Sequence, residues 1–230
     1  MQLSKRLRAV AKMVTPTAAI ADIGCDHGYI PIYLVKGGIV SHALAMDINY
    51  GPLECAKENI AAYNYENKIE TRLSDGLVAL GQGEVQGIVI AGMGGNLIIK
   101  ILSEGKAIIA NVAEMILQPQ SEIAEVRKFL QANDYYIVAE NMVCEDDKYY
   151  PMMKVMHGRM ESLREVDYRY GPCLLKDKNS VLKKFLEKEK KTLEKITKQI
   201  SVAGSGKSLC RVEEIKQEMC LNEMARKEYE

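Results

Sequence analysis

Residues 21–29 read Ala-Asp-Ile-Gly-Cys-Asp-His-Gly-Tyr, an apolar run that breaks into a glycine-spaced turn and continues in a helical pattern. A strand that ends in such a turn is suited to binding a nucleotide. Gly24 and Gly28 let the backbone approach a ligand, and the following helix begins with unpaired N–H groups. The interval Asp22-x-Gly24-x-x-x-Gly28 differs from the G-x-G-x-x-G of dinucleotide-binding folds. It therefore predicts no pyrophosphate cradle and disfavours an oxidoreductase.

An acid also stands at the end of each of the next two predicted strands. Asp47 lies about 20 residues after the glycine turn, where a carboxylate accepts hydrogen bonds from both ribose hydroxyls. Alternatively, Asp47 has a purely structural role as a helix N-cap. Asp75, in Ser-Asp-Gly at 74–76, is expected to accept from an adenine amino group, although Asp-Gly is also a common turn pair. An acid before a wide glycine turn suits a ligand that joins a cationic centre to a nucleoside, and S-adenosylmethionine is the candidate.

Residues 91–96 read Ala-Gly-Met-Gly-Gly-Asn and end the fourth predicted strand. So many glycines let the backbone run close under a flat ligand, while a structural turn into the next helix is the alternative. The stretch lacks the Asn/Asp-Pro-Pro-aromatic motif of many methyltransferases that act on exocyclic base nitrogens. Gln118, in Leu-Gln-Pro-Gln at 117–120, is expected above the same crevice.

Short apolar strands alternate with helical patterns through most of the chain. This predicts an α/β fold with a doubly wound, Rossmann-like sheet of the class I methyltransferase kind. We expect strands at 19–23, 43–47, 69–73, 87–91 and 115–118, and helices at 3–14, 29–36, 51–63, 96–104 and 121–132. Segments 135–140 and 152–157, separated by the acidic and aromatic residues 141–151, predict an antiparallel finish to the sheet.

The last quarter of the chain changes character. A heptad seam with one polar position is formed by Leu182, Leu186, Glu189, Leu193, Ile196 and Ile200. Gly204-Ser205-Gly206 interrupts it, and a second helical stripe follows at Leu209, Val212, Ile215 and Met219. The pattern predicts a coiled-coil-like helical hairpin beginning near Gly171-Pro172, and so two domains, 1–170 and 171–230. The short seam also permits dimerisation, so we expect a monomer or a weak dimer.

A net charge of zero hides basic segments near both ends of the 230 residues. Lys5, Arg6, Arg8 and Lys12 lie in residues 1–14, which contain no acid, and residues 176–200 hold nine lysines against four acids. Such ends can bind a polyanion and leave a central ligand pocket free. Solvated helix faces are the alternative explanation.

The six cysteines are scattered without a C-x-x-C pair, which predicts reduced thiols. No Cys or His set has metal-ligand spacing, so we predict no metal site. The basic start has no apolar stretch behind it, and nowhere do 18 apolar residues run together. We therefore expect a cytoplasmic protein that does not enter a membrane.

The motifs at 22–29, 45–47, 74–76, 91–95 and 117–120, followed by a helical hairpin, resemble the bacterial tRNA (adenine(22)-N1)-methyltransferase family over essentially the whole chain. The resemblance implies methyl transfer from S-adenosylmethionine to N1 of adenine 22 in the D-arm of tRNA. It implies cofactor contacts at Asp22, Gly24, Cys25, Gly28, Asp47, Ile48, Asp75, Gly76, Ala91, Gly92, Met93, Gly94 and Gln118. It also implies tRNA contacts at Lys5, Arg6, Arg8 and Lys12, with the hairpin as an accessory tRNA-binding unit.

Catalytic contacts are expected at Asp26, His27 and Tyr29. The target adenine must leave its stack, and Tyr29 is the expected stacking partner. Adenine N1 carries an in-plane lone pair, so attack requires orientation more than proton removal. Asp26 is expected to accept from the 6-amino group, with backbone capping of the turn as its alternative. His27 either hydrogen-bonds the base or supports the turn.

Two other functions fit the same residues. A methyltransferase of the same fold could act on another RNA, a small molecule or a protein. The basic segments near both ends disfavour a small-molecule or protein substrate. A non-catalytic nucleotide-binding scaffold could instead use the C-terminal helices for dimerisation. The crevice acids favour the enzyme.

Overall fold

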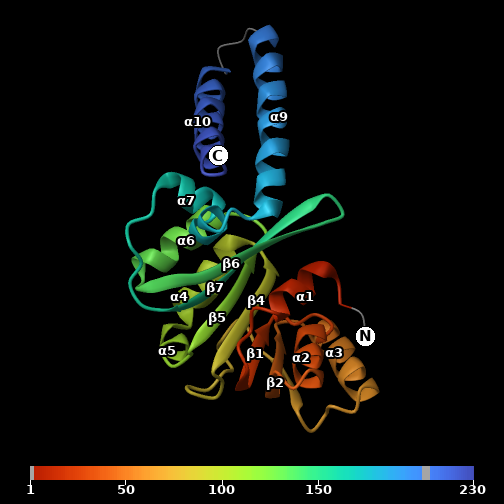
Figure 1. The fold of residues 1–230 in the computed structure, drawn as a ribbon. Helices are drawn as coiled ribbons and strands as arrows, with labels where there is room; N and C mark the ends of the chain where they lie inside the picture. The colour runs from red at the N-terminus through yellow and green to blue at the C-terminus, as the bar shows by residue number, and fades with distance from the viewer. Residues whose placement is uncertain (1–2, 204–207) are drawn as a thin grey trace. The chain divides into compact units, whose positions relative to one another are not determined.

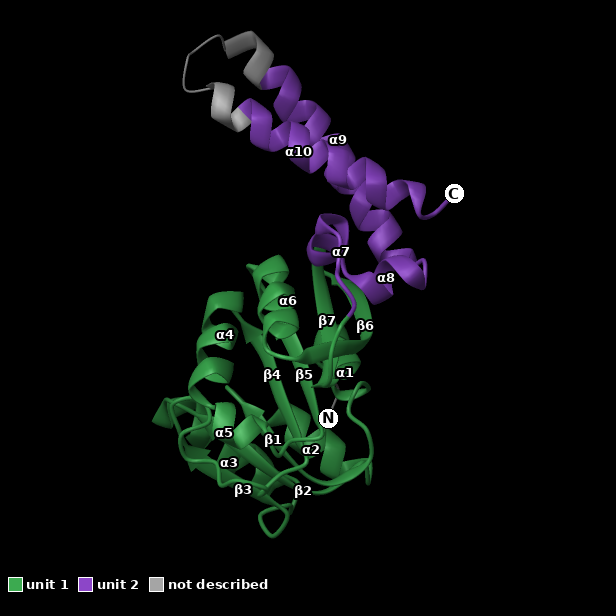
Figure 2. Ribbon diagram, turned by 90° about the vertical axis from the view of Figure 1, so that its left-hand side faces the viewer, with its two compact units in different colours: residues 1–160 green, residues 161–230 purple. Residues whose placement is uncertain are grey.

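The structure is a computed structural model that describes residues 3–203 and 208–230, without the side chains of residues 200–203 and 208–211. It divides into two compact units, Met1–Met160 and Glu161–Glu230, coloured separately in Figure 2. Each unit is described by itself. None of the helices in the described ranges combines the length and apolar character needed to cross a membrane.

The first unit is built on a seven-stranded sheet with the order β3-β2-β1-β4-β5-β7-β6. Its strands are β1 (Thr17–Ile23), β2 (Val40–Asp47), β3 (Ile69–Leu73), β4 (Gly87–Met93), β5 (Glu114–Pro119), β6 (Tyr135–Glu145) and β7 (Lys148–His157). Strands β1 to β5 pair in parallel, whereas β7 lies antiparallel between β5 and β6. The predicted doubly wound sheet with an antiparallel last strand is confirmed. Its order reverses between β1 and β4, the switch point where such folds bind ligands.

Helices cover both faces of this sheet (Figure 1). One face carries α1 (Lys5–Ala11), α2 (Tyr29–Lys36) and α3 (Tyr50–Ala62), and the other carries α4 (Gly95–Glu104), α5 (Lys106–Ile109) and α6 (Ile123–Ala132). Ile20, Val89 and Ile116 of the sheet pack into one buried cluster with Ile32 of α2 and Ala56 of α3. Because both faces are covered, the central strands read as continuous apolar runs.

Residues 141–151 differ from the sequence prediction. The expected connecting segment is mostly strand, and Glu145 pairs with Lys148 across a two-residue turn. Asp146 and Asp147 hold positive φ angles of 49° and 57°, which suits a tight hairpin turn and which aspartate tolerates. The prediction was wrong because Asp-Asp is a weaker hairpin signal than Asn-Gly or Asp-Gly.

The second unit contains the predicted helical hairpin. Its helices are α7 (Glu165–Tyr170), α8 (Pro172–Lys176), α9 (Ser180–Ala203) and α10 (Ser208–Lys227). The partners Glu187–Arg226, Glu189–Asn222 and Thr197–Met219 run in opposite directions, so α9 and α10 are antiparallel. Leu182, Leu186 and Leu193 of the seam are buried. Gly204-Ser205-Gly206 and the side chains of Ile200 and Leu209 lie outside the described residues.

The polar position of the seam has a structural role. The Glu189 carboxylate accepts hydrogen bonds from Tyr170 Oη at 2.6 Å, Arg169 Nη2 at 2.9 Å and Asn222 Nδ2 at 2.9 Å. A satisfied polar group in an apolar seam fixes its register. The network ties α7 to the hairpin, and the second unit begins at Glu161, before α7 and earlier than Gly171-Pro172. Neither α7 nor α8 was predicted.

Candidate functional site

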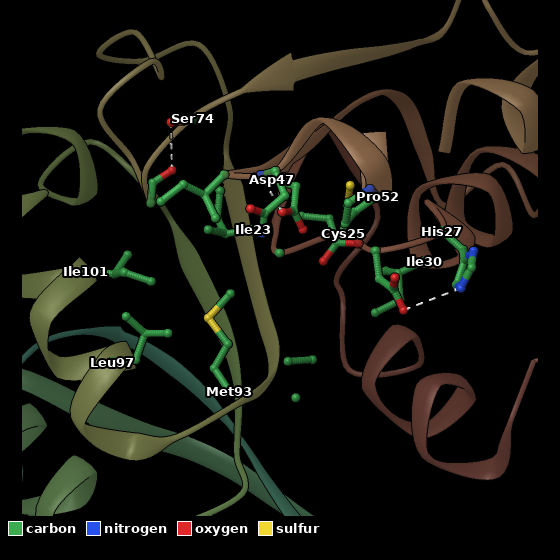
Figure 3. Close-up of a pocket in the computed structure, with 18 of the residues that line it drawn as sticks. Ile23, Cys25, His27, Ile30, Asp47, Pro52, Ser74, Met93, Leu97 and Ile101 are labelled. Carbon is green, nitrogen blue, oxygen red and sulfur yellow. Dashed lines mark hydrogen bonds and ion pairs between the residues drawn. The ribbon is translucent and has the colours of Figure 1, made fainter. Parts of the chain in front are cut away.

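A cavity of about 470 Å³ opens where the parallel strands end, around the turn after β1 (Figure 3). Most of its wall comes from four sequence motifs: the turn after β1, the end of β2, the loop after β3 and the end of β4. Because carboxyl ends of parallel strands share one edge of the sheet, residues far apart in sequence meet there. The predicted residues that line the cavity are Asp22, Gly24, Cys25, Asp26, His27, Tyr29, Asp47, Ile48, Asp75, Gly76, Ala91, Gly92 and Met93.

Three predicted cofactor residues do not line the cavity. Gly28 precedes α2 with φ 67°, and a Cβ there would lie 3.2 Å from Ala56 Cβ, so this glycine permits close helix packing. Gly94 stands at the N-cap of α4. Gln118 is fully buried, and its Oε1 accepts from Arg6 Nη1 at 2.9 Å.

Other lining residues were not predicted. Leu97 and Ile101 of α4 face Asp47 and Pro52 across the cavity in Figure 3. Their spacing of four residues marks one helix face, but only the tertiary arrangement shows that this face borders a ligand. The remaining unpredicted lining residues are Leu7, Ile23, Ile30, Asn49, Ser74 and Gln120, together with Arg6, which was predicted as a tRNA contact.

Asp22 is the most perturbed acid of the cavity. Its side chain is 3% exposed, and burial, reinforced by the charge of Asp47, raises its pKa to about 7. A buried carboxyl near neutrality favours a cationic ligand, which stabilises the ionised form. Burial, with the nearby charge of Asp22, also raises the pKa of the Cys25 thiol, which therefore stays neutral.

Asp47 is held at the edge of the cavity. Its Oδ1 accepts a hydrogen bond from the Asn49 backbone N at 2.9 Å. The N-cap of α3 is Asn49 itself, so Asp47 does not cap this helix. The carboxylate thus faces the cavity with acceptor capacity left for a ligand.

Asp26 and His27 form the exposed side of the same turn, and the half-buried Tyr29 follows the buried Gly28. Asp26 adopts φ 51°, and its side chain is 73% exposed, with Oδ2 lying 3.6 Å from His27 Nε2. The His27 and Tyr29 rings stack at 5.2 Å with an interplanar angle of 20°. Asn59 Nδ2 donates to the His27 carbonyl at 3.0 Å, which fixes the turn from behind. In the described part of the chain the Asp26 carboxylate does not cap the turn.

Glycines shape the floor of the cavity to fit a nucleoside. Gly24 has φ +74°, and a Cβ there would lie 2.2 Å from Met93 Cε. Gly76 has φ +58°, and a Cβ there would lie 3.1 Å from Ile101 Cγ1. Together with acids for a cationic centre and for hydroxyls, this floor fits S-adenosylmethionine in size and chemistry. Within residues 3–203 and 208–230, no group of three or more His, Cys, Asp and Glu side chains could hold a metal ion.

Gly24→Ala should reduce cofactor affinity at least tenfold and destabilise the fold by about 1 kcal/mol, because the new Cβ strains a left-handed residue and pushes Met93 into the cavity. Calorimetric binding of S-adenosylhomocysteine and urea unfolding measure the two effects. Gly38→Ala is the control, since Gly38 has φ +65° but nothing within 4 Å of a new Cβ. Equal affinity in both variants would contradict the role of Gly24.

The predicted tRNA-binding residues of α1 and its C-cap separate into two groups. Lys5, Arg8 and Lys12 are exposed, and Lys5 Nζ donates to the Cys144 carbonyl at 2.9 Å. Arg6 instead is partly buried and lines the cavity.

Residues 20–224 match the family model TrmK, tRNA (adenine(22)-N(1))-methyltransferase. The chain is 35% identical over 209 residues to the tRNA (adenine(22)-N(1))-methyltransferase of Bacillus subtilis (strain 168), covering 89% of this chain and 88% of that one. A structure of Streptococcus pneumoniae Sp1610 in complex with S-adenosyl-L-methionine has a TM-score of 0.87 and 35% identity, over 98% and 100% of the two chains. M. capricolum TrmK in complex with S-adenosyl-homocysteine has a TM-score of 0.85 and 29% identity, over the whole of both chains. The chain belongs to the tRNA (adenine(22)-N(1))-methyltransferase family.

Proposed function

We propose that this protein transfers a methyl group from S-adenosylmethionine to N1 of adenine 22 in the D-arm of tRNA, and that it acts in the cytoplasm. The observation that carries the proposal is the cavity in which the buried Asp22, the Asp47 carboxylate and Gly24 with its positive φ meet. Membership of the family supports the substrate and the position methylated.

On the cofactor side, each strand end supplies one contact. Asp22 and Gly24 line the methionine end, Asp47 accepts from the ribose hydroxyls, and Asp75 with Gly76 lies at the adenine. Ile48 and Leu97, both exposed and both lining the cavity, offer apolar contact to the flat base. S-adenosylmethionine, when bound, supplies a methyl group on a positively charged sulfur.

On the substrate side, the exposed turn receives the flipped adenine. The stacked His27 and Tyr29 rings offer a flat surface that offsets the loss of base stacking. The Asp26 carboxylate accepts from the 6-amino group and stabilises the positive charge that the base acquires as N1 is alkylated. The N1 lone pair needs no general base, so these residues act by orienting the base and stabilising its charge.

The rest of the tRNA is held by basic surfaces. Lys184, Lys188, Lys191 and Lys195 are exposed at spacings of four, three and four residues, which places them on one face of α9. RNA helices are recognised by shape and by their phosphates, which suits a straight basic helix.

Replacing these four lysines together by glutamine should weaken tRNA binding at least tenfold. It should also reduce the salt dependence, because each lost phosphate contact lowers the slope of log binding constant against log salt concentration by about one. Binding of S-adenosylhomocysteine should not change. Filter binding across a salt series measures the first effect. The control replaces Lys57 and Lys100, surface lysines of the first unit that pair with Glu54 and Glu104. An unchanged salt slope in the four-lysine variant would contradict the role of this face.

The function is tested by transfer of labelled methyl groups from S-adenosylmethionine. We expect incorporation into unmodified tRNA and none into the same tRNA carrying guanine at position 22. Incorporation into both tRNAs would point to another nucleotide. Incorporation into a metabolite pool, but not into tRNA, would favour the small-molecule alternative.

A further inference from the structure

Among the described residues that line the cavity, Arg6 is the one lysine or arginine. The acids around it are Asp22, Asp26, Asp47 and Asp75. Its Nη1 lies 3.4 Å from the position that a Cβ on Gly92 would take, so the guanidinium stands at the end of β4. The Asp47 carboxylate lies at the end of β2, on the other side of β1. The guanidinium is therefore separated by one strand from the proposed ribose site.

Contacts at both ends of the residue hold this guanidinium in place. Nη1 donates to Oε1 of the buried Gln118 at 2.9 Å, and the guanidinium carbon lies 5.7 Å from the centre of the Tyr150 ring. At the backbone, the Glu145 carboxylate accepts from Lys5 N at 2.6 Å and Arg6 N at 3.2 Å, which fixes the start of α1 to β6. These backbone bonds lower the pKa of Glu145, so its charge is kept.

The side chain keeps unused donor capacity. A guanidinium has five N–H donors, and here one of them meets the neutral Gln118 amide. Within the described residues, no carboxylate accepts a hydrogen bond from it. A fixed guanidinium with an open fork is suited to an oxyanion, which it can bind through two parallel hydrogen bonds.

The substrate itself requires such a group. An adenosine that enters the cavity brings its flanking phosphates towards four carboxylates, and their repulsion opposes entry. A cation at the cavity offsets that repulsion and leaves Asp22 and Asp47 available for the cofactor. Arg8 and Lys12 continue the positive charge along α1 outside the cavity.

We propose that Arg6 binds a phosphate next to the flipped target adenosine and so positions the base. This rests on the proposed function and gives Arg6 a role distinct from the general attraction exerted by the exposed basic residues. A carboxylate of the cofactor is the other oxyanion that the same fork could bind, and the experiment separates the two.

The test compares Arg6→Gln with Arg8→Gln in the full chain, using methyl transfer to unmodified tRNA under single-turnover conditions. Arg6→Gln should reduce kcat/KM by 30-fold or more, roughly 2 kcal/mol at 1.4 kcal/mol per tenfold, whereas Arg8→Gln should reduce it less than fivefold. Arg6→Lys, which keeps the charge but loses the fork, should fall between them. Affinity for S-adenosylhomocysteine should stay within twofold of the wild type in all three variants.

A second arm uses tRNA with a neutral methylphosphonate at either phosphate flanking adenine 22. The wild type should methylate one of these two tRNAs more slowly than the unsubstituted tRNA. On that tRNA, Arg6→Gln should lower the rate little further, because the two changes remove the same contact. Additive losses, or equal effects of Arg6→Gln and Arg8→Gln, would overturn the proposal. Loss of S-adenosylhomocysteine affinity in Arg6→Gln would assign the fork to the cofactor. Absence of methylation by the wild type would instead defeat the proposed function on which this inference rests.

Discussion

Replacing Asp22 by asparagine should abolish the pH dependence of cofactor binding. In the free protein the pKa of Asp22 is raised to about 7 by burial and by the charge of Asp47. A cationic ligand stabilises the carboxylate and lowers this pKa, so the wild type should bind S-adenosylmethionine about tenfold more tightly at pH 8 than at pH 6. Asp22→Asn should bind with the same, weaker affinity at both values. Calorimetry at the two pH values measures this.

The same substitution should stabilise the empty protein. The folded-state pKa of Asp22 lies above its ordinary value of 3.8, so between about pH 4 and 7 the native state holds more protons than the unfolded state. The contribution of Asp22 to the free energy of unfolding is therefore fully present below pH 4 and is lost as the pH rises through 7. Raising a pKa by one pH unit corresponds to about 1.4 kcal/mol, so Asp22→Asn should be a few kcal/mol more stable than the wild type at pH 8 and unchanged at pH 4.

Asp75→Asn is the matched control, because Asp75 is an exposed carboxylate of the same cavity. It should keep the rise in affinity between pH 6 and pH 8, and urea unfolding should show no pH-dependent gain in stability. A pH-independent wild type, or an equal stability gain for Asp22→Asn at pH 4 and pH 8, would contradict the assignment of Asp22 to a cationic ligand.

Asp47→Ala should weaken cofactor binding at least 100-fold. The proposed bonds from the two ribose hydroxyls to the carboxylate are charge-assisted, and each contributes roughly 1.5–3 kcal/mol. The fold should be preserved, because Asp47 is only partly buried and, within the described part of the chain, its one side-chain hydrogen bond is to the Asn49 backbone. Binding of S-adenosylhomocysteine measures the loss.

A double-mutant cycle with the 2′-deoxy analogue of S-adenosylhomocysteine tests the atom assigned to Asp47. The wild type should bind the analogue at least tenfold more weakly than the parent ligand, whereas Asp47→Ala should bind the two equally. Asp75→Ala, as the control, should still discriminate as the wild type does. If Asp47→Ala also discriminated fully, the ribose would lie elsewhere.

The sheet and most of the cavity could be predicted because both depend on local signals. Apolar runs mark the strands, and Asp22, Asp47 and Asp75 follow their strands at the edge where a parallel sheet places its ligands. Gly24 indicates a positive φ because a side chain would be strained there.

The remaining parts of the site depend on tertiary packing. Arg6 lies at the cavity while its backbone is held by Glu145 of the β6–β7 hairpin, whose Asp146-Asp147 turn was not predicted. Gln118 lies at the predicted strand end but is buried under Arg6, and Gln120 lines the cavity instead. Register alone does not decide which of two neighbouring glutamines faces a ligand.

In the proposed function, this cavity directs methylation to N1 of one adenine in tRNA. An N1 methyl blocks the pairing edge of the base, so reverse transcription of unmodified tRNA treated with the protein and S-adenosylmethionine should stop at adenine 22. The stop should be absent without the cofactor and with Asp47→Ala at low cofactor concentration. Full-length extension through adenine 22 on tRNA that has taken up labelled methyl groups, or a stop at another nucleotide, would show that the protein does not methylate N1 of adenine 22.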